Sequence, residues 1–373
     1  MIEIVNLSSN NPKIAQIVPQ LPPAINGVGD YALNLACQLR QDWGIETNFI
    51  VGDTHWQGAN TIEGFAVQKI VDYSSKRLSL LLLNQSSLQI PVLLHYVGYG
   101  YAKRGYPVWL IEGLRNWKAN NDNSHFVTMF HEIYASSKKP WESSFWLSPL
   151  QKNLAVQLAK LSDRCLTSKQ LYAEILYNLS GGKHTQIPTL PVFSNIGEPE
   201  QIPPLADRHR RMIVFGSVSN RRRVYQESLT ELIHACKLLE IEEIWDIGSS
   251  TGLKLSTVNG LPVLEMGKQP APEISKIMLN SLAGFLNYHP DFLGRSTIFA
   301  SYCAHGLLPV SAKGSKLPVD GIELGKHYWM PNLDEVPGEL KASAIANHAY
   351  SWYQTHNLSV QAQIFSSNLF SNF

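Results

Sequence analysis

The densest cluster of charge in this chain is a run of three arginines, Arg221-Arg222-Arg223, which follows a short apolar segment and the pair Gly216-Ser217. A guanidinium group stays charged and offers a planar set of N–H donors that suits phosphate oxygens. The sequence therefore predicts an anion site here, of the kind that binds a diphosphate. The alternative is a solvated basic turn.

A glycine loop near the start of the chain is a second candidate. Gly27-Val28-Gly29-Asp30 follows two prolines and an apolar run and precedes a helix-like segment. A strand that turns through glycines into a helix brings backbone N–H groups to the carboxyl edge of a sheet, where an anion can bind. The loop lacks the third glycine of the dinucleotide fingerprint. The alternative is a tight turn, with Asp30 favoured in the first helical turn by the helix dipole.

His131 and Glu132 directly follow the apolar residues 126–130. At the end of a strand, His131 could polarise a substrate hydroxyl or accept its proton, and Glu132 could orient it. The alternative is a loop histidine that bonds to backbone. The aromatic segment 95–101, also at a strand end, offers ring faces that suit sugars, or else forms a packed loop.

The residues Gly294, Arg295, Ser296 and Thr297 lie between a predicted strand and a predicted helix. Free N–H groups at the helix start would form another seat for an anion, and Gly294 would permit close approach of a ligand. Ordinary capping by Ser296 or Thr297 is the alternative, and it needs no ligand.

Several chemistries have no matching motif. The chain contains no P-loop, no metalloprotease helix, no Gly-x-Ser-x-Gly elbow and no Asp-x-Asp pair for a divalent metal. We therefore expect a reaction without a metal site. The four cysteines are far apart in apolar segments and are interpreted as reduced core residues.

Charge and hydropathy place further limits on function. With 31 Lys and Arg against 30 Asp and Glu, the chain lacks the basic excess that a nucleic-acid partner requires. The first residues do not resemble a secretory signal, and no apolar run approaches a membrane span. We expect a cytoplasmic protein, with peripheral docking at the inner face of a membrane left open for lipid acceptors.

Hydrophobic periodicity predicts an α/β protein made of two tandem doubly wound, Rossmann-like domains. Expected strands cover 14–18, 47–51, 90–97, 126–130 and 164–167, and, after a Pro- and Gly-rich break, 212–215, 244–247, 263–266, 282–286 and 308–311. Expected helices cover 31–40, 107–117, 149–160, 169–179, 226–239, 271–280 and 296–304. The predicted domains are 1–195 and 196–340, facing a central cleft, with helices in 341–373 that cross back to brace the first domain.

Taken together, these segments resemble the retaining glycosyltransferases of the GT-B fold, a large bacterial group that uses nucleotide sugars. The matching residues are Pro22-Pro23 with 27–32, Phe130-His131-Glu132, Phe215-Gly216, Gly267, and Ala304-His305-Gly306 with Pro309-Val310. The resemblance implies transfer of a sugar from a nucleotide diphosphate donor to a hydroxyl of a glycan, lipid-linked or small-molecule acceptor. It implies no cofactor beyond that donor.

By resemblance, Gly27, Gly29 and His131 face the transferred sugar, and Arg221 to Arg223 hold the donor diphosphate. The backbone of 295–297 would hold phosphate oxygens. The family's two glutamates, which have seven residues between them, fall on Leu293 and Ser301. Ser301 could still donate a hydrogen bond to a ribose.

The missing glutamates leave two alternatives to an active transferase. One is a catalytically silent GT-B protein that binds nucleotide or glycan, or that scaffolds a partner enzyme. The other is a tandem-Rossmann enzyme of similar fold, such as a nucleotide-sugar epimerase.

Overall fold

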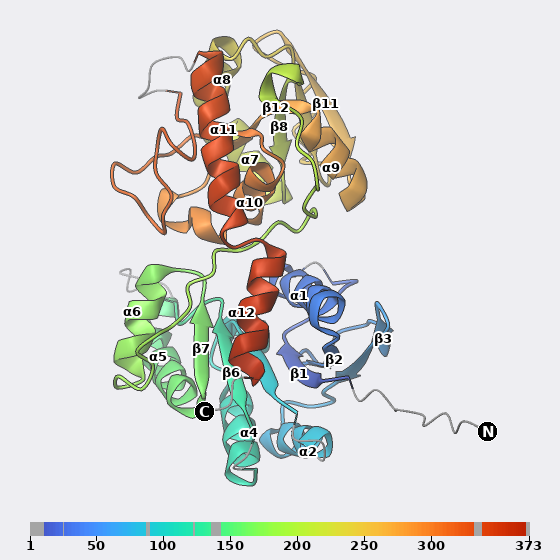
Figure 1. Ribbon diagram of the computed structural model, residues 1–373, viewed down its shortest axis with the longest axis vertical. Helices are drawn as coiled ribbons and strands as arrows, with labels where there is room; N and C mark the ends of the chain where they lie inside the picture. The colour runs from blue at the N-terminus through green and yellow to red at the C-terminus, as the bar shows by residue number, and fades with distance from the viewer. Residues whose placement is uncertain are drawn as a thin grey trace, which may run out of the picture. The chain divides into compact units, whose positions relative to one another are not determined.

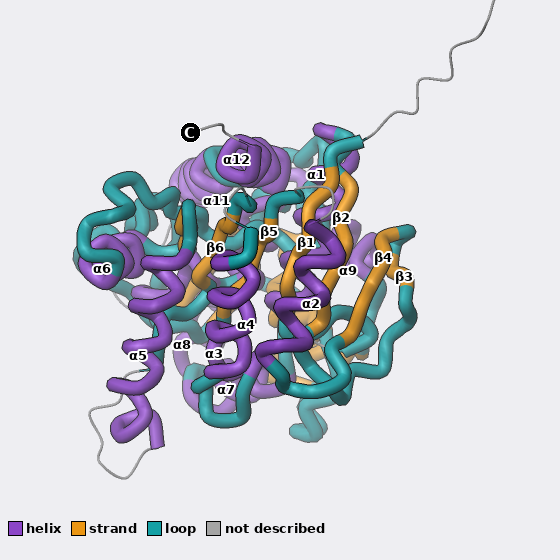
Figure 2. Tube along the Cα trace, turned by 90° about the horizontal axis from the view of Figure 1, so that it is seen from below, coloured by secondary structure: helices purple, strands orange, loops and turns teal. Residues whose placement is uncertain are grey.

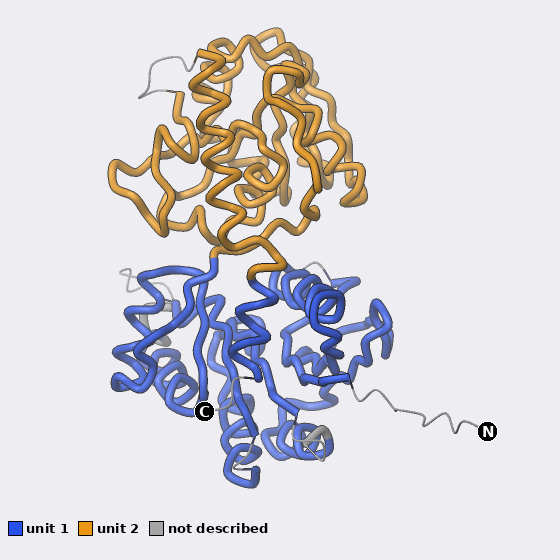
Figure 3. The backbone as a smooth tube through the Cα atoms, viewed as in Figure 1, with its two compact units in different colours: residues 1–190, 361–373 blue, residues 191–360 orange. Residues whose placement is uncertain are grey.

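The chain folds into two compact units, which Figure 3 shows in different colours. A computed structural model describes residues 11–24, 26–86, 90–121, 124–135, 143–331 and 338–370. The first unit is formed by Met1–Leu190 with Gln361–Phe373, and the second by Pro191–Val360. Each unit has helices around one mainly parallel sheet (Figure 1).

The sheet of the first unit has the strand order β3-β4-β2-β1-β5-β6-β7. Its strands are β1 (Lys13–Val18), β2 (Glu46–Val51), β3 (Thr61–Ile62), β4 (Phe65–Lys69), β5 (Val92–Tyr96), β6 (Phe126–Phe130) and β7 (Arg164–Thr167). All neighbours pair in parallel except β3 and β4. The order reverses between β1 and β5, and open α/β sheets bind ligands at such a switch point.

Helices cover both faces of this sheet, so its central strands are apolar and fully buried. The helices are α1 (Gly27–Trp43), α2 (Ser75–Ser86), α3 (Gly98–Tyr101), α4 (Val108–Ala119), α5 (Ser143–Leu161) and α6 (Gln170–Leu179), with α12 (Leu358–Phe370) from the end of the chain. Figure 2 shows α1 and α12 on one face and α2 and α4 on the other. Ala32 and Ala36 of α1 pack with Phe49, and Leu78 and Leu114 pack in the core of the opposite face.

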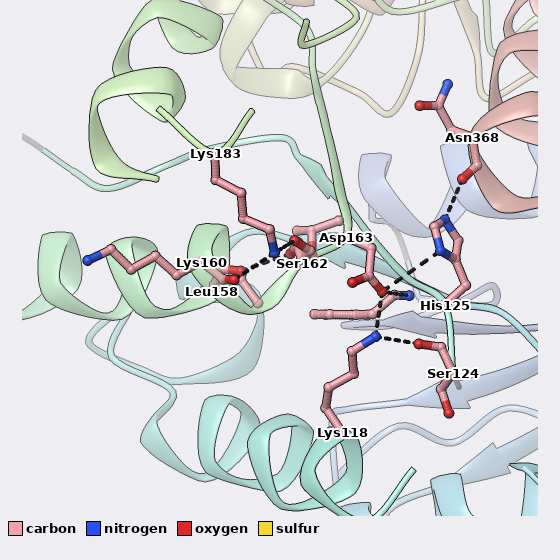
Figure 4. Close-up of polar contacts among 11 residues, drawn as sticks. Lys118, Ser124, His125, Leu158, Lys160, Ser162, Asp163, Lys183 and Asn368 are labelled. Carbon is pink, nitrogen blue, oxygen red and sulfur yellow. Dashed lines mark hydrogen bonds and ion pairs between the residues drawn. The ribbon is translucent and has the colours of Figure 1, made fainter. Parts of the chain in front are cut away.

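A polar network at the amino end of β6 holds α12 to the first unit (Figure 4). The Asp163 carboxylate accepts from Lys118 Nζ at 2.5 Å and from the backbone N–H of Phe126 at 2.8 Å. His125 lies beside it and donates from Nε2 to the backbone carbonyl of Asn368 at 2.7 Å. Burial lowers the pKa of His125, which favours the neutral ring.

The sheet of the second unit has the order β10-β11-β9-β8-β12-β13, with only β10 antiparallel to its neighbour among the described strands. Its strands are β8 (His209–Phe215), β9 (Glu243–Ile247), β10 (Thr257–Val258), β11 (Leu261–Gly267), β12 (Ser281–Leu286) and β13 (Leu308–Ser311). Its helices are α7 (Val218–Glu227), α8 (Leu229–Leu238), α9 (Ala271–Leu279), α10 (Thr297–Ala304) and α11 (Glu339–Gln354). The switch point here lies between β8 and β12.

The predicted α/β class and the doubly wound sheets are confirmed, and each expected strand overlaps an observed one. The elements β3, β4, β10, α2 and α3 were not predicted from the sequence. The expected helix over 226–239 is wrong in its limits, because helix begins at Val218 and breaks at Ser228. The Ser228 hydroxyl accepts from Asn287 Nδ2 at 2.7 Å at this break. No helix in the described part of the chain is long and apolar enough to cross a membrane.

Candidate functional site

His131 lies at the carboxyl edge of the first sheet, as the sequence predicts. It directly follows β6, and its backbone N–H donates to the carbonyl of Tyr96, the last residue of β5, at 3.0 Å. Its side chain is 7% exposed. The position is therefore fixed by two neighbouring strands rather than by a flexible loop. Glu132, the next residue, is partly exposed at the same edge.

A chain of buried polar side chains extends from His131 into the sheet. His131 Nε2 lies 3.1 Å from His95 Nδ1, and His95 Nε2 lies 2.9 Å from Gln16 Oε1. Gln16 in turn donates from Nε2 to the hydroxyl of Thr47 at 3.3 Å. Burial, reinforced by the neighbouring His131, lowers the pKa of His95 well below its usual value, so His95 is neutral.

Two helices enclose the outer side of this histidine pair. The ring of Tyr31 on α1 meets the ring of His131 edge-on, with centroids 5.0 Å apart. The Tyr31 hydroxyl donates to Gln361 Oε1 on α12 at 2.6 Å, and Phe365 packs edge-on against the same tyrosine. The C-terminal helix therefore helps to place the side chains around His131.

The start of α1 does not form the anion-binding site that was expected at Gly27 and Gly29. The side chain of Asn26 accepts from the backbone N–H groups of Val28 and Gly29, each at 3.0 Å. Because these two N–H groups already donate to the capping residue, the loop is better interpreted as a tight turn. Asp30 stands in the first turn, where burial raises its carboxyl pKa.

Gly29 has a steric role that gives a testable prediction. A Cβ added at Gly29 would lie 2.2 Å from the backbone oxygen of Gln20, so α1 or the preceding loop must shift. We expect Gly29→Ala to lower the free energy of unfolding by about 1–3 kcal/mol. Gly27→Ala is the matched control, since nothing lies within 4 Å of its added Cβ. Urea unfolding measures the stability of both variants, and equal free energies of unfolding would contradict the prediction.

The aromatic segment 95–101 spans the end of β5 and the short helix α3, and most of its rings are packed. Tyr96 and Tyr101 are buried, and the Tyr101 hydroxyl donates to the backbone carbonyl of His95 at 2.9 Å. Tyr99 is 43% exposed and is the ring of this segment that can offer a face to a ligand.

The three arginines of the second unit are part of α7 and do not form a turn. Ser217 caps this helix by accepting from the N–H of Asn220 at 3.3 Å, and Gly216 before it adopts a φ of +128°. Successive residues of a helix point in different directions, which separates the three side chains. The expectation of one arginine cluster is therefore wrong.

Arg221 is 1% exposed and points into the unit. Its Nε donates to the carbonyl of Gly216 at 3.0 Å, and its terminal nitrogens contact the Asp246 carboxylate and the carbonyl of Ser249. A buried arginine with these partners does not fit the predicted diphosphate role. Arg222 and Arg223 are exposed.

These two exposed arginines remain candidates for the diphosphate. Arg222 donates from Nε to the carbonyl of Thr251 at 2.8 Å, and Arg223 donates to Asn220 Oδ1 at 2.6 Å. Both contacts leave the guanidinium groups at the surface, beside the carboxyl edge of β8.

The segment before α10 forms a short 3-10 turn, Pro290–Arg295, followed by a capped helix. The Ser296 hydroxyl accepts from the N–H of Phe299 at 3.2 Å, and the Ser296 N–H donates to Leu293 at 2.9 Å. Capping thus accounts for Ser296, and a role of Arg295 and Thr297 towards phosphate stays a prediction. Gly294 has no close neighbour that would exclude a Cβ.

Ser301 does not fit the predicted ribose contact. It is fully buried, its hydroxyl lies 3.1 Å from that of Ser194, and it donates to the carbonyl of Thr297 at 2.8 Å. Leu293 is buried as well. Gly267 ends β11 with a φ of +67° and accepts from the N–H of Gly248 at 2.9 Å.

The cavities found among the described residues lie away from these edges. One of about 270 Å³ in the second unit is lined by Leu205, Arg208, Leu282 and Ala342, near the amino ends of β8 and β12. Another, of about 660 Å³, lies along α6 in the first unit. Because open α/β sheets bind ligands at their carboxyl ends, we place the candidate site at His131 rather than in either cavity. The described residues contain no group of three metal-ligating side chains.

The fold of this chain is similar to that of several solved structures. No model of a protein family matches it, and no curated protein matches it in sequence. Among solved structures, the pneumococcal O-GlcNAc transferase GtfA in complex with UDP and GlcNAc has a TM-score of 0.56 at 10% identity, over 96% of this chain and 99% of that one. An α,α-trehalose 6-phosphate synthase from Burkholderia multivorans has a TM-score of 0.57 at 10% identity, over 97% and 98%.

A third structure belongs to a different class of enzyme. This protein from Listeria monocytogenes, assigned as a UDP-N-acetylglucosamine 2-epimerase, has a TM-score of 0.57 at 12% identity, over 95% of both chains. Two Rossmann-like domains in tandem and these similarities define a GT-B fold. At such identities the likeness establishes the fold, which transferases and an epimerase share.

Proposed function

We propose that this protein is a glycosyltransferase that moves a sugar from a nucleotide diphosphate donor to a hydroxyl acceptor. The observation that carries the proposal is the position of His131, at the carboxyl edge of the first sheet with a hydrogen-bonded partner behind it. The fold supports it, because the GtfA structure of the same fold holds UDP and GlcNAc. The resemblance of the Phe130-His131-Glu132 segment to retaining GT-B enzymes points the same way.

In this proposal the two units have different tasks. His131 accepts a hydrogen bond from a hydroxyl of the bound sugar or acceptor, with Glu132 beside it. Arg222 and Arg223 stabilise the diphosphate as it leaves, since charge develops on its oxygens when the bond to the sugar breaks. The acceptor hydroxyl attacks on the face from which the diphosphate leaves and passes its proton to a departing diphosphate oxygen, so the anomeric configuration is retained. The acceptor is a glycan, a lipid-linked sugar or a small molecule.

A catalytically silent nucleotide-binding protein is the second candidate. The observation that favours it is the burial of Leu293 and Ser301, the positions that correspond to the family's two glutamates. Such a protein binds a nucleoside diphosphate without turning over any donor. An epimerase is distinguished by conversion of a nucleotide sugar in the absence of acceptor.

Calorimetric titration with UDP, GDP and ADP tests the donor half of the proposal. We expect one of them to bind, and Arg223→Met to weaken that binding about tenfold, the effect of losing roughly 1.4 kcal/mol of a charge-assisted contact. Arg210→Met is the matched control, because Arg210 is half-exposed at the amino end of β8. Absence of binding by all three nucleotides would contradict both transfer and silent binding.

A further inference from the structure

The cavity of about 660 Å³ in the first unit is a groove along α6, called the α6 groove below, that the proposed function does not use. One wall is a face of the helix. It consists of Gln170, Ala173, Glu174, Tyr177 and Asn178, whose spacing places them on one side of α6 over about 12 Å. The small side chain of Ala173, in the middle of this face, leaves room for a ligand. The volume lies within the range of about 300–1,000 Å³ that is typical of small-molecule sites.

The opposite wall is formed by residues 184–187, and the sheet holds it in place. Gly181 and Gly182 follow α6 with φ values of +69° and +81° and turn the chain back along the helix. Directly after this wall, the carbonyl of Pro188 accepts from the N–H of Thr167 in β7 at 3.0 Å. The shape of the α6 groove is therefore set by the fold of the first unit.

His184 supplies the groove with a hydrogen-bond acceptor. Its side chain is 6% exposed, and its Nε2 must donate to the carbonyl of Ala159, at 2.8 Å, because a carbonyl can only accept. Burial lowers the pKa of His184, so the ring is neutral and Nδ1 carries a lone pair. Nδ1 has no partner among the described residues and is not sealed from solvent. A ligand hydroxyl in the groove can donate to it.

The charges of the lining exclude an anionic ligand. Glu174 is the charged side chain of the described lining, and His184 is neutral. Lys183, beside this wall, is directed elsewhere, because its Nζ donates to the carbonyls of Lys160 and Ser162 at 2.9 and 2.6 Å (Figure 4). A phosphate or carboxylate in the groove would be repelled by Glu174 without a cation to compensate.

The remaining side chains suit a ligand rich in hydroxyl groups. Four of them carry an amide or a hydroxyl, namely Gln170, Asn178, Thr185 and Gln186. These groups donate and accept hydrogen bonds, as sugar hydroxyls do. Tyr177 is 47% exposed and offers an apolar ring face, against which the C–H groups of a sugar ring can pack. A purely apolar ligand would bury the polar groups without partners, at a cost in free energy.

We infer that the α6 groove is a carbohydrate-binding site for a neutral oligosaccharide. None of its lining residues belongs to the candidate site at His131, so this is a second site on the first unit. The inference goes beyond the proposed transfer of a sugar and does not depend on it, because it rests on the lining of the groove alone.

The direct test is a titration of the full-length protein with neutral tetrasaccharides, followed in ¹H–¹⁵N spectra of its backbone amides. The probes are maltotetraose, cellotetraose, xylotetraose, mannotetraose and tetra-N-acetylchitotetraose, with inorganic phosphate as the anionic comparison. We expect at least one tetrasaccharide to shift the signals of residues 173–187 with a Kd below about 1 mM, and phosphate to shift none of them. Phosphate binding in the groove, or no shift there with any of the five sugars, would overturn the inference.

Three variants of exposed side chains on and beside the groove test its lining. We expect Tyr177→Ala to weaken tetrasaccharide binding about fivefold or more, and Gln186→Ala about two- to tenfold. Leu171→Ala is the matched control and should bind within about twofold of wild type, because Leu171 is 54% exposed on the same helix but does not line the groove. Equal affinities of Tyr177→Ala and wild type would contradict the inference. A protein that binds a tetrasaccharide in the groove but transfers no sugar would refute the proposed function and leave this site intact.

Discussion

Replacing His131 by alanine is expected to lower the rate of sugar transfer by about 10²–10³-fold, the scale of a lost acid–base or hydrogen-bonding group at a reacting centre. Donor binding should change far less, because the nucleotide contacts assigned to Arg222 and Arg223 lie on another unit of the chain. Product formation under single-turnover conditions, beside calorimetric binding of the nucleoside diphosphate, measures the two effects separately.

Replacing an exposed histidine by alanine is the matched control for the loss of a histidine side chain elsewhere in the protein. His55 follows β2, and its side chain is 86% exposed. We expect His55→Ala to transfer at the wild-type rate. His131→Ala also leaves His95 Nδ1 without its hydrogen-bonding partner, which costs about 1–3 kcal/mol, so the folding of the variant is checked by urea unfolding. A folded His131→Ala protein that transfers within twofold of wild type would contradict a role of this side chain in the reaction.

Arg221→Met is expected to destabilise the second unit by about 3–5 kcal/mol, because it removes the partner of a buried carboxylate. Asp246 is 3% exposed, and burial is the main cause that raises the pKa of this carboxyl, while Arg221 opposes the rise. Without the guanidinium, the carbonyls of Gly216 and Ser249 lose a donor as well. Urea unfolding of the intact chain, followed by circular dichroism, measures the change in the free energy of unfolding.

Two further variants distinguish an ion pair from simple loss of volume. Arg221→Met combined with Asp246→Leu removes both charges, and should recover most of the lost stability. Arg223→Met, two positions along the same helix, replaces an exposed side chain and should alter the free energy of unfolding by less than about 0.5 kcal/mol. Equal destabilisation by Arg221→Met and Arg223→Met would show that the buried pair contributes nothing.

The strands were predictable because parallel strands covered on both faces have continuous apolar sequences. The segment that forms β6 is apolar apart from one threonine, and it ends directly at His131, so both the strand and the edge position of the histidine follow from local sequence. The arginines were placed wrongly for a local reason. Ser217 is a good N-cap residue, and a helix that begins just after it puts Arg221 on the inner face of α7.

The hydrogen-bonded side chains behind His131 could not be predicted from local sequence alone. Gln16 and His95 are polar residues among the buried apolar residues of their strands, and a buried polar side chain requires a partner. That signal was present in the sequence, but the partners lie 79 positions apart and the strand order brings them together. Gln361, which bonds Tyr31 across 330 positions, could not be found from local patterns at all.

Alignment with the family's motif did not predict the surroundings of Ser301. Placing Ala304-His305-Gly306 on the family pattern correctly located a helix followed by a strand. It also implied an accessible side chain at Ser301, which is instead covered and bonded to Ser194. Burial at that position depends on the segment after residue 190, which the motif does not include.

We propose that this protein breaks the bond between a sugar and a nucleoside diphosphate with the help of His131. The most direct measurement is release of nucleoside diphosphate from a panel of UDP-, GDP- and ADP-sugars, by wild type and by His131→Ala, with a mixture of sugar and glycoside acceptors. We expect wild type to release the nucleotide from at least one donor, and His131→Ala to lose this activity while still binding the free nucleotide. Release from no donor, or equal release by the two proteins, would contradict it.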